Sequence, residues 1–126
     1  MRKGALMSDL PSKKIKVAGK TLIVFEAGFV HGLQRSIRIA DAGKETPKFY
    51  EKLNLSGDVV RYVHQLLYPS LISCSEGSVP TEEEFLKLKD KEVNDWINAA
   101  QKRNEDWFSL NGANKESMEK KQSQQP

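Results

Sequence analysis

The sequence predicts an α+β domain that is mainly helical, with an N-terminal β-hairpin packed on a small bundle of four or five helices. Three observations support this fold class. β-branched residues cluster between residues 14 and 26, apolar residues recur at helical spacing from Phe29 onward, and capping signals precede the later apolar runs. The 126 residues suit a single domain. We expect it to span residues 14–109, between a flexible basic arm (residues 1–13) and a disordered polar tail (residues 110–126).

The hairpin is expected over residues 14–26. Two β-branched runs, residues 15–17 and 21–25, are separated by Ala18-Gly19-Lys20. Gly19 can adopt the positive φ that a tight turn needs. An isolated hairpin is only marginally stable in water, so we expect it to pack on helices or to pair with another strand.

A first helix is expected from Phe29 to a stop at Gly43. Its apolar residues fall at i, i+4, i+8 and i+11, and we expect this stripe to face the core. The stripe consists of Phe29, Leu33, Ile37 and Ala40. Arg35 and Arg38 point elsewhere on the same helix.

A central helix is expected to begin after Ser56, which can serve as its N-cap. Pro69 lacks an amide N–H and restricts the residue before it, so we expect the helix to kink or restart there and to end at Gly77. Its broad apolar face consists of Val59, Val60, Val63, Leu66 and Leu67.

The clearest local signal is a capping box, in which Thr81 is followed three residues later by Glu84. A short helix should begin there, and Asp90 is expected to cap a further helix that carries Trp96. The expected core of the domain consists of Leu33, Ile37, Val63, Leu66, Leu67, Phe85, Trp96 and Ile97.

Each candidate for catalysis or metal binding has a simpler structural interpretation. His31 and His64 have no partner at a recognisable metal-ligand spacing, and Cys74 is expected to fill a small buried position. The acidic run Glu82–Glu84 suits the start of a helix. We therefore predict a protein without enzymatic activity, metal or cofactor.

The charge distribution argues against nucleic-acid binding. Residues 1–20 carry six Lys/Arg and one Asp, whereas residues 21–110 carry eleven Lys/Arg and fourteen Asp/Glu. The folded part is therefore mildly acidic, unlike the basic surface of most nucleic-acid-binding domains. The chain also lacks the apolar run of a membrane span or a signal peptide, so we expect a cytoplasmic protein without membrane contact.

The second half of the sequence resembles the tail assembly chaperones of long-tailed bacteriophages (siphophages) and related prophages. The motifs that carry the resemblance are Tyr68-Pro69-Ser70-Leu71, Cys74-Ser75-Glu76-Gly77, Val79-Pro80-Thr81-Glu82-Glu83-Glu84-Phe85, Asp95-Trp96 and Asn104-Glu105-Asp106-Trp107-Phe108. The resemblance implies a protein that binds the tape measure protein, keeps it soluble and helps recruit tail tube subunits. It also implies action in the cytoplasm of the bacterial host and absence from the mature virion.

Four residues are candidate partner contacts, namely Trp107, Phe108, Arg35 and Arg38. The two aromatic residues suit either the core or a partner-binding surface. Two other functions stay open. One is a small nucleic-acid-binding protein that uses the basic arm with Arg35, Arg38 and Arg61. The other is a virion head–tail connector or tail-completion protein. An unpaired hairpin edge could also support self-association.

Overall fold

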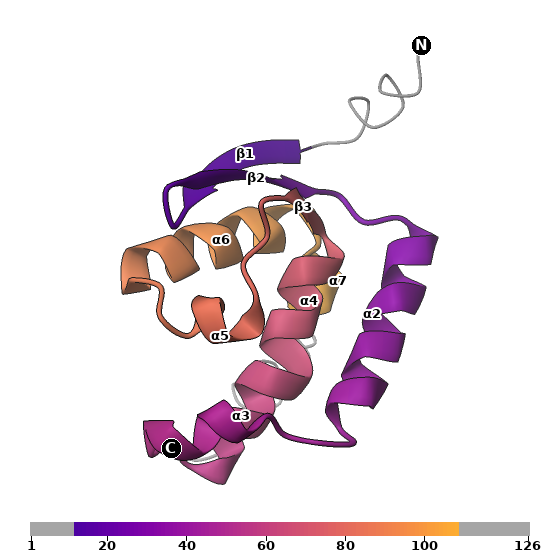
Figure 1. Cartoon of the computed structure of the whole chain (residues 1–126). Coiled ribbons are helices and arrows are strands. Elements are labelled where there is room, and N and C mark those ends of the chain that lie inside the picture. Colours follow the sequence, from indigo (N-terminus) through magenta and orange to yellow (C-terminus); the bar gives the residue numbers. More distant parts are fainter. Residues whose placement is uncertain (1–11, 109–126) are drawn as a thin grey trace, which may run out of the picture.

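The computed structural model describes residues 12–108 (Figure 1). The expected tail and all but the last two residues of the expected arm lie outside the described residues. Strands β1 (Ser12–Val17) and β2 (Lys20–Phe25) form the predicted antiparallel hairpin, with Ser12 opposite Phe25 and Val17 opposite Lys20. Ala18 and Gly19 both have positive φ, 55° and 76°. This is the turn conformation whose twist matches that of the two strands.

A third strand, β3 (Ser75–Gly77), pairs antiparallel with β2 and gives the sheet order β1-β2-β3. The prediction that this segment forms the end of the central helix is wrong. The helix ends at Ser73, and Gly77 has a φ of 97°. A Cβ atom at Gly77 would lie 3.3 Å from the carbonyl oxygen of Thr21, so this glycine allows the close approach of β3 to β2.

The predicted α+β, mainly helical class is confirmed by the elements that follow the hairpin. The helices are α2 (Phe29–Ala42), the 3₁₀ helix η1 (Lys48–Leu53), α3 (Gly57–Tyr62), the π-helical η2 (Val63–Leu67), α4 (Tyr68–Ser73), α5 (Glu82–Phe85), α6 (Asp90–Arg103) and α7 (Glu105–Phe108). Within the described part of the chain, none of these helices is long and apolar enough to cross a membrane.

The central helix passes through Pro69 by means of a π-helical segment. Elements α3, η2 and α4 follow one another without a break from Gly57 to Ser73. The amide N–H of Tyr68 donates to the carbonyl of Val63, five residues earlier. This wider turn directly precedes Pro69, whose ring and missing N–H a regular α-helix accommodates poorly.

The core lies between the sheet and helices α4 and α6, and Figure 1 shows α6 beneath the hairpin. Trp96 is fully buried, and its indole N–H donates to the Ser75 hydroxyl at 2.9 Å. The ring of Phe85 packs edge-on against Trp96, with centroids 5.7 Å apart. The core prediction is confirmed for Leu67, Phe85 and Trp96, while Val63 and Ile97 are partly buried and pack against the same cluster. Leu66 is only partly buried.

The start of α5 follows its predicted capping signal, whereas α6 begins one residue earlier than predicted. The Thr81 hydroxyl accepts from the amide of Glu84 at 3.2 Å, and the Glu84 carboxylate accepts from the amide of Thr81 at 2.9 Å. The predicted capping box is therefore confirmed. The prediction that Asp90 caps the next helix is wrong, because Asp90 is the first residue of α6 and Lys89 occupies the cap position, where its amide donates to the Glu92 carboxylate at 3.3 Å.

Asn104 joins the C-terminal end of α6 to the chain that leaves the hairpin. Its side-chain oxygen accepts from the amide of Ala27 at 2.7 Å, and its side-chain nitrogen donates to the carbonyl of Phe25 at 2.9 Å. The amide of Gly28 then donates to Nδ1 of His31 at 2.8 Å, in the first turn of α2. These bonds hold the start of α2 beside the body of the protein.

Candidate functional site

Helix α2 presents its apolar stripe to solvent. The exposed fractions are 84% for Phe29, 54% for Val30, 48% for Leu33 and 61% for Ile37, and α2 contains no buried residue. The prediction that Leu33 and Ile37 belong to the core is therefore wrong. A stripe of large apolar side chains along one helix is a feature of interaction surfaces rather than of the ordinary exterior of a monomer.

The face of α2 that contacts the body of the protein carries two arginines. Nε of Arg35 donates to the Ser70 hydroxyl at 2.7 Å, and Nη2 donates to the Trp107 carbonyl at 3.2 Å. Nη1 of Arg38 donates to the Ser73 hydroxyl at 2.9 Å. Both serines belong to α4 and are almost fully buried, with exposed fractions of 1% and 2%. A polar interface between α2 and α4 therefore determines which face of α2 turns inward.

The arginines and the serines of this interface have the same spacing, a pattern that was not among the predictions from the sequence. Arg35 and Arg38 lie three residues apart on α2, and Ser70 and Ser73 lie three residues apart on α4. Residues at this spacing lie on one face of a helix, so each arginine can reach one serine. Burial lowers the pKa of the Arg35 guanidinium from 12.5, but the group still carries its charge at neutral pH.

The two aromatic candidates occupy different environments. Phe108 is buried in the core with an exposed fraction of 4% and offers no surface to a partner in this conformation. Trp107 is partly buried, and the Arg35 guanidinium carbon lies 5.1 Å from its ring centroid. Arg35 and Trp107 thus meet as a cation–π pair within the fold, while Arg38 bonds to α4. The structure places the apolar surface on the opposite face of α2.

A second group of exposed apolar residues lies on the segment from η1 to α3, the first part of the central helix. Leu53, Leu55, Val59 and Tyr62 each have exposed fractions between 41% and 44%. They belong to η1, α3 and the connection between them. In Figure 1 this segment lies at the end of the molecule far from the sheet.

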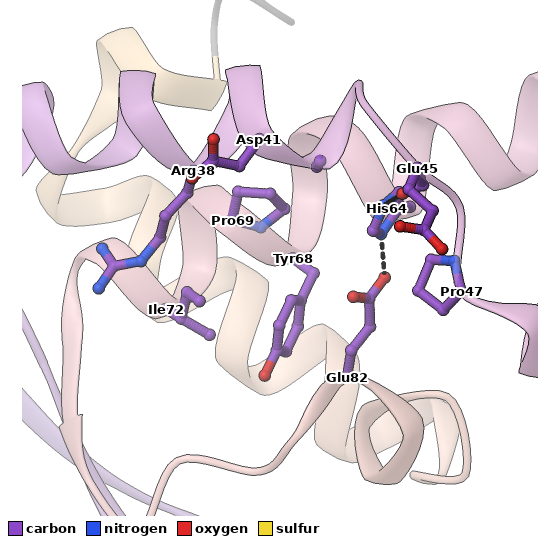
Figure 2. A pocket seen from close by; sticks show the side chains of 10 residues that line it. Arg38, Asp41, Glu45, Pro47, His64, Tyr68, Pro69, Ile72 and Glu82 are labelled. Carbon is purple, nitrogen blue, oxygen red and sulfur yellow. Dashed lines mark hydrogen bonds and ion pairs between the residues drawn. The ribbon is translucent and has the colours of Figure 1, made fainter.

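A cavity of about 530 Å³ lies among α2, the central helix and the start of α5, and Figure 2 shows the side chains that line it. His64 and Glu82 both line it and are in direct contact. Nδ1 of His64 lies 2.8 Å from the Glu82 carboxylate, and Nε2 lies 2.9 Å from the carbonyl oxygen of Glu45. The hydroxyl of Tyr50 donates to the same Glu82 oxygen at 2.5 Å.

The polar groups of this network hydrogen-bond to one another and hold the surrounding elements together. A carbonyl oxygen can only accept, so Nε2 of His64 donates to Glu45, and Nδ1 is hydrogen-bonded to the Glu82 carboxylate. Both ring nitrogens are thereby engaged, which leaves His64 no free lone pair for a metal or a substrate proton. Burial and the hydrogen bond to Glu82 raise the pKa of Tyr50. The network connects the loop after α2, η1 and α5.

Other reactive side chains also have structural environments. Cys74 is fully buried, and burial raises the pKa of its thiol to about 12, so the residue is a neutral thiol at physiological pH. Within residues 12–108, no group of three or more His, Cys, Asp or Glu side chains is arranged to hold a metal ion. The apolar face of α2 is therefore the best candidate functional site.

Comparisons of the chain with protein-family models, curated proteins and solved structures find no significant match. The exposed face of α2 and the sequence motifs of residues 68–108 are the features of the chain that bear on its function.

Proposed function

We propose that this protein is a phage tail assembly chaperone that binds an amphipathic helix of the tape measure protein along the outer face of α2. It keeps that protein soluble in the cytoplasm of the bacterial host, helps recruit tail tube subunits and leaves the assembled tail. The observation that carries the proposal is the outward apolar surface of α2, where the stripe residues Phe29, Leu33 and Ile37, together with Val30, are exposed.

The dimensions of the stripe suit a helical partner. From Phe29 to Ile37 the helix rises about 12 Å, which is roughly two turns. An amphipathic helix can lay a seam of similar length against it, with anchor side chains at helical spacing. Each large apolar side chain that leaves water contributes up to about 1.5–3 kcal/mol. A contact of two turns is small, which suits a partner that must later be released.

The nucleic-acid alternative has less support in this arrangement. It uses the basic arm, of which residues 1–11 lie outside the described residues, together with a basic surface formed by Arg35, Arg38 and Arg61. The first two donate to buried serines, and Arg61 forms an ion pair with Asp58. Two of the three guanidinium groups are therefore engaged inside the fold, and only Arg61, in an exposed ion pair, remains at the surface.

Co-expression with the tape measure protein of the same phage or prophage tests the proposal. The full chain should increase the soluble fraction of that protein. The double variant Phe29→Gln/Ile37→Gln should lose this effect while remaining folded by circular dichroism. The matched control Gln34→Ala/Ser36→Ala changes two exposed residues beside the stripe on the same helix and should retain it. A tape measure protein that is equally insoluble with and without the wild-type chain would sink the proposal.

A further inference from the structure

Strand β1 is the edge of the sheet and has no strand beside its outer side among the described residues. An edge strand presents unpaired N–H and C=O groups that can hydrogen-bond to another extended chain. Three of the six residues of β1 are lysines, namely Lys13, Lys14 and Lys16. Lysines on an edge disfavour pairing with another basic strand, including the β1 strand of a second copy.

A cavity of about 580 Å³ runs between β1 and α6. It touches the four consecutive residues Lys13–Lys16. Consecutive strand residues point to opposite faces of a sheet, so a cavity that touches all four follows the edge of the strand. The opposite wall is formed by α6, from Lys91 to Arg103. We refer to this cavity as the β1–α6 groove.

The β1–α6 groove carries a surplus of positive charge. Of its two carboxylates, Asp95 pairs with Lys91 at 2.7 Å, and Glu92 accepts from the amide of Ala18 at 2.9 Å. The three β1 lysines and Lys102 have no ion-pair partner within residues 12–108. Arg103 adds a further cation, and its Nε is a buried donor without a hydrogen-bond partner in the same range.

We propose that the β1–α6 groove binds an extended acidic segment of a partner protein, which pairs with β1 as an additional strand. Main-chain hydrogen bonds to β1 supply a general affinity for an extended chain, and the lysines select carboxylate side chains. This surface uses β1 and α6, whereas the proposed tape measure contact uses α2. Absence of peptide binding in the groove would therefore leave the tape measure proposal standing, and the reverse also holds. A nucleic acid would use the lysines but would not need the free edge of β1.

Binding of a fluorescent synthetic peptide to the full chain tests this inference. The probe is a ten-residue peptide that alternates glutamate with valine and threonine. One comparison peptide has glutamine at each glutamate, and another is N-methylated at alternate backbone amides. We expect the acidic peptide to bind in fluorescence anisotropy at low salt and each comparison peptide to bind at least tenfold more weakly. Backbone amide signals of residues 12–17 should shift when the acidic peptide is added.

Charge reversal separates this groove from general electrostatic attraction. The variant Lys13→Glu/Lys102→Glu should weaken binding at least tenfold, whereas Lys48→Glu/Lys52→Glu, with the same change in net charge on η1, should weaken it less than threefold. Equal loss in both variants would overturn the inference. So would absence of binding by the wild-type chain, unchanged affinity for the N-methylated peptide, or tighter binding of a single-stranded DNA of the same length. The inference would also be overturned if sedimentation detects a dimer and the amide signals of residues 12–17 change as that dimer forms.

Discussion

Replacing Arg35 with methionine would test which face of α2 contacts the body of the protein. Methionine keeps much of the aliphatic length and the helix propensity of arginine but removes the guanidinium. The change eliminates the hydrogen bonds to the Ser70 hydroxyl and the Trp107 carbonyl, together with the contact to the Trp107 ring. The complementary variant, Phe29→Gln/Ile37→Gln, removes apolar groups from the opposite face.

The structure predicts unequal effects on the free energy of unfolding. A hydrogen bond to a charged group contributes roughly 1.5–3 kcal/mol when it is well buried. Because the Arg35 side chain is only half-buried, solvent screening reduces this figure. We expect a total loss of about 2 kcal/mol, including the cation–π contact. Phe29 and Ile37 are mostly in contact with water already, so their replacement should change stability by less than about 0.5 kcal/mol.

Urea unfolding followed by circular dichroism measures the change in the free energy of unfolding for Arg35→Met and for Phe29→Gln/Ile37→Gln. Arg61→Met is the matched control, since Arg61 is exposed and pairs with the exposed Asp58, and it should cost less than about 0.5 kcal/mol. If Phe29→Gln/Ile37→Gln destabilises the protein more than Arg35→Met does, then the apolar stripe is buried in the native fold. That result would refute the orientation of α2 and remove the main support for the proposed function.

Two further predictions concern buried polar and reactive groups. Cys74 should resist thiol reagents at pH 8 until the protein unfolds, because it is fully buried and burial raises its thiol pKa to about 12. Since an unfolded thiol has a pKa near 8.5, this group's contribution to stability should persist below about pH 8.5 and fall as the pH rises toward 12, and Cys74→Ala should remove that part of the pH dependence. Glu82→Gln should cost about 1–3 kcal/mol in urea unfolding, because it weakens the contacts to His64 and Tyr50, whereas the exposed neighbour Glu83→Gln should have little effect.

Several elements could be predicted from the sequence because their causes are local. The hairpin turn depends on Gly19 beside two β-branched runs, and the start of α5 depends on the reciprocal bonds of Thr81 and Glu84. The ends of α2 likewise follow from the onset of helical spacing at Phe29 and from Gly43. Each of these features arises between residues a few positions apart, so the pattern of residue types is sufficient to predict it.

Other features depend on residues that are distant in the sequence. Strand β3 forms because Ser75–Gly77 lies beside β2, about fifty residues earlier in the chain. The bond between His64 and Glu82 joins residues 18 positions apart. The three residues of β3 are too few to show the alternation of a strand. The local sequence around His64 likewise contains no pattern that indicates Glu82 as its partner.

Helix α2 shows most clearly what the sequence determines and what the tertiary structure determines. The sequence by itself determined that residues 29–42 form a helix with an apolar stripe on one side and Arg35 and Arg38 on another. Only the tertiary structure decided which side faces inward. The physical reason is that Ser70 and Ser73, each 35 positions away, provide buried acceptors for the two arginines. The arginine face therefore packs on α4, and the apolar stripe faces solvent, where a partner could cover it.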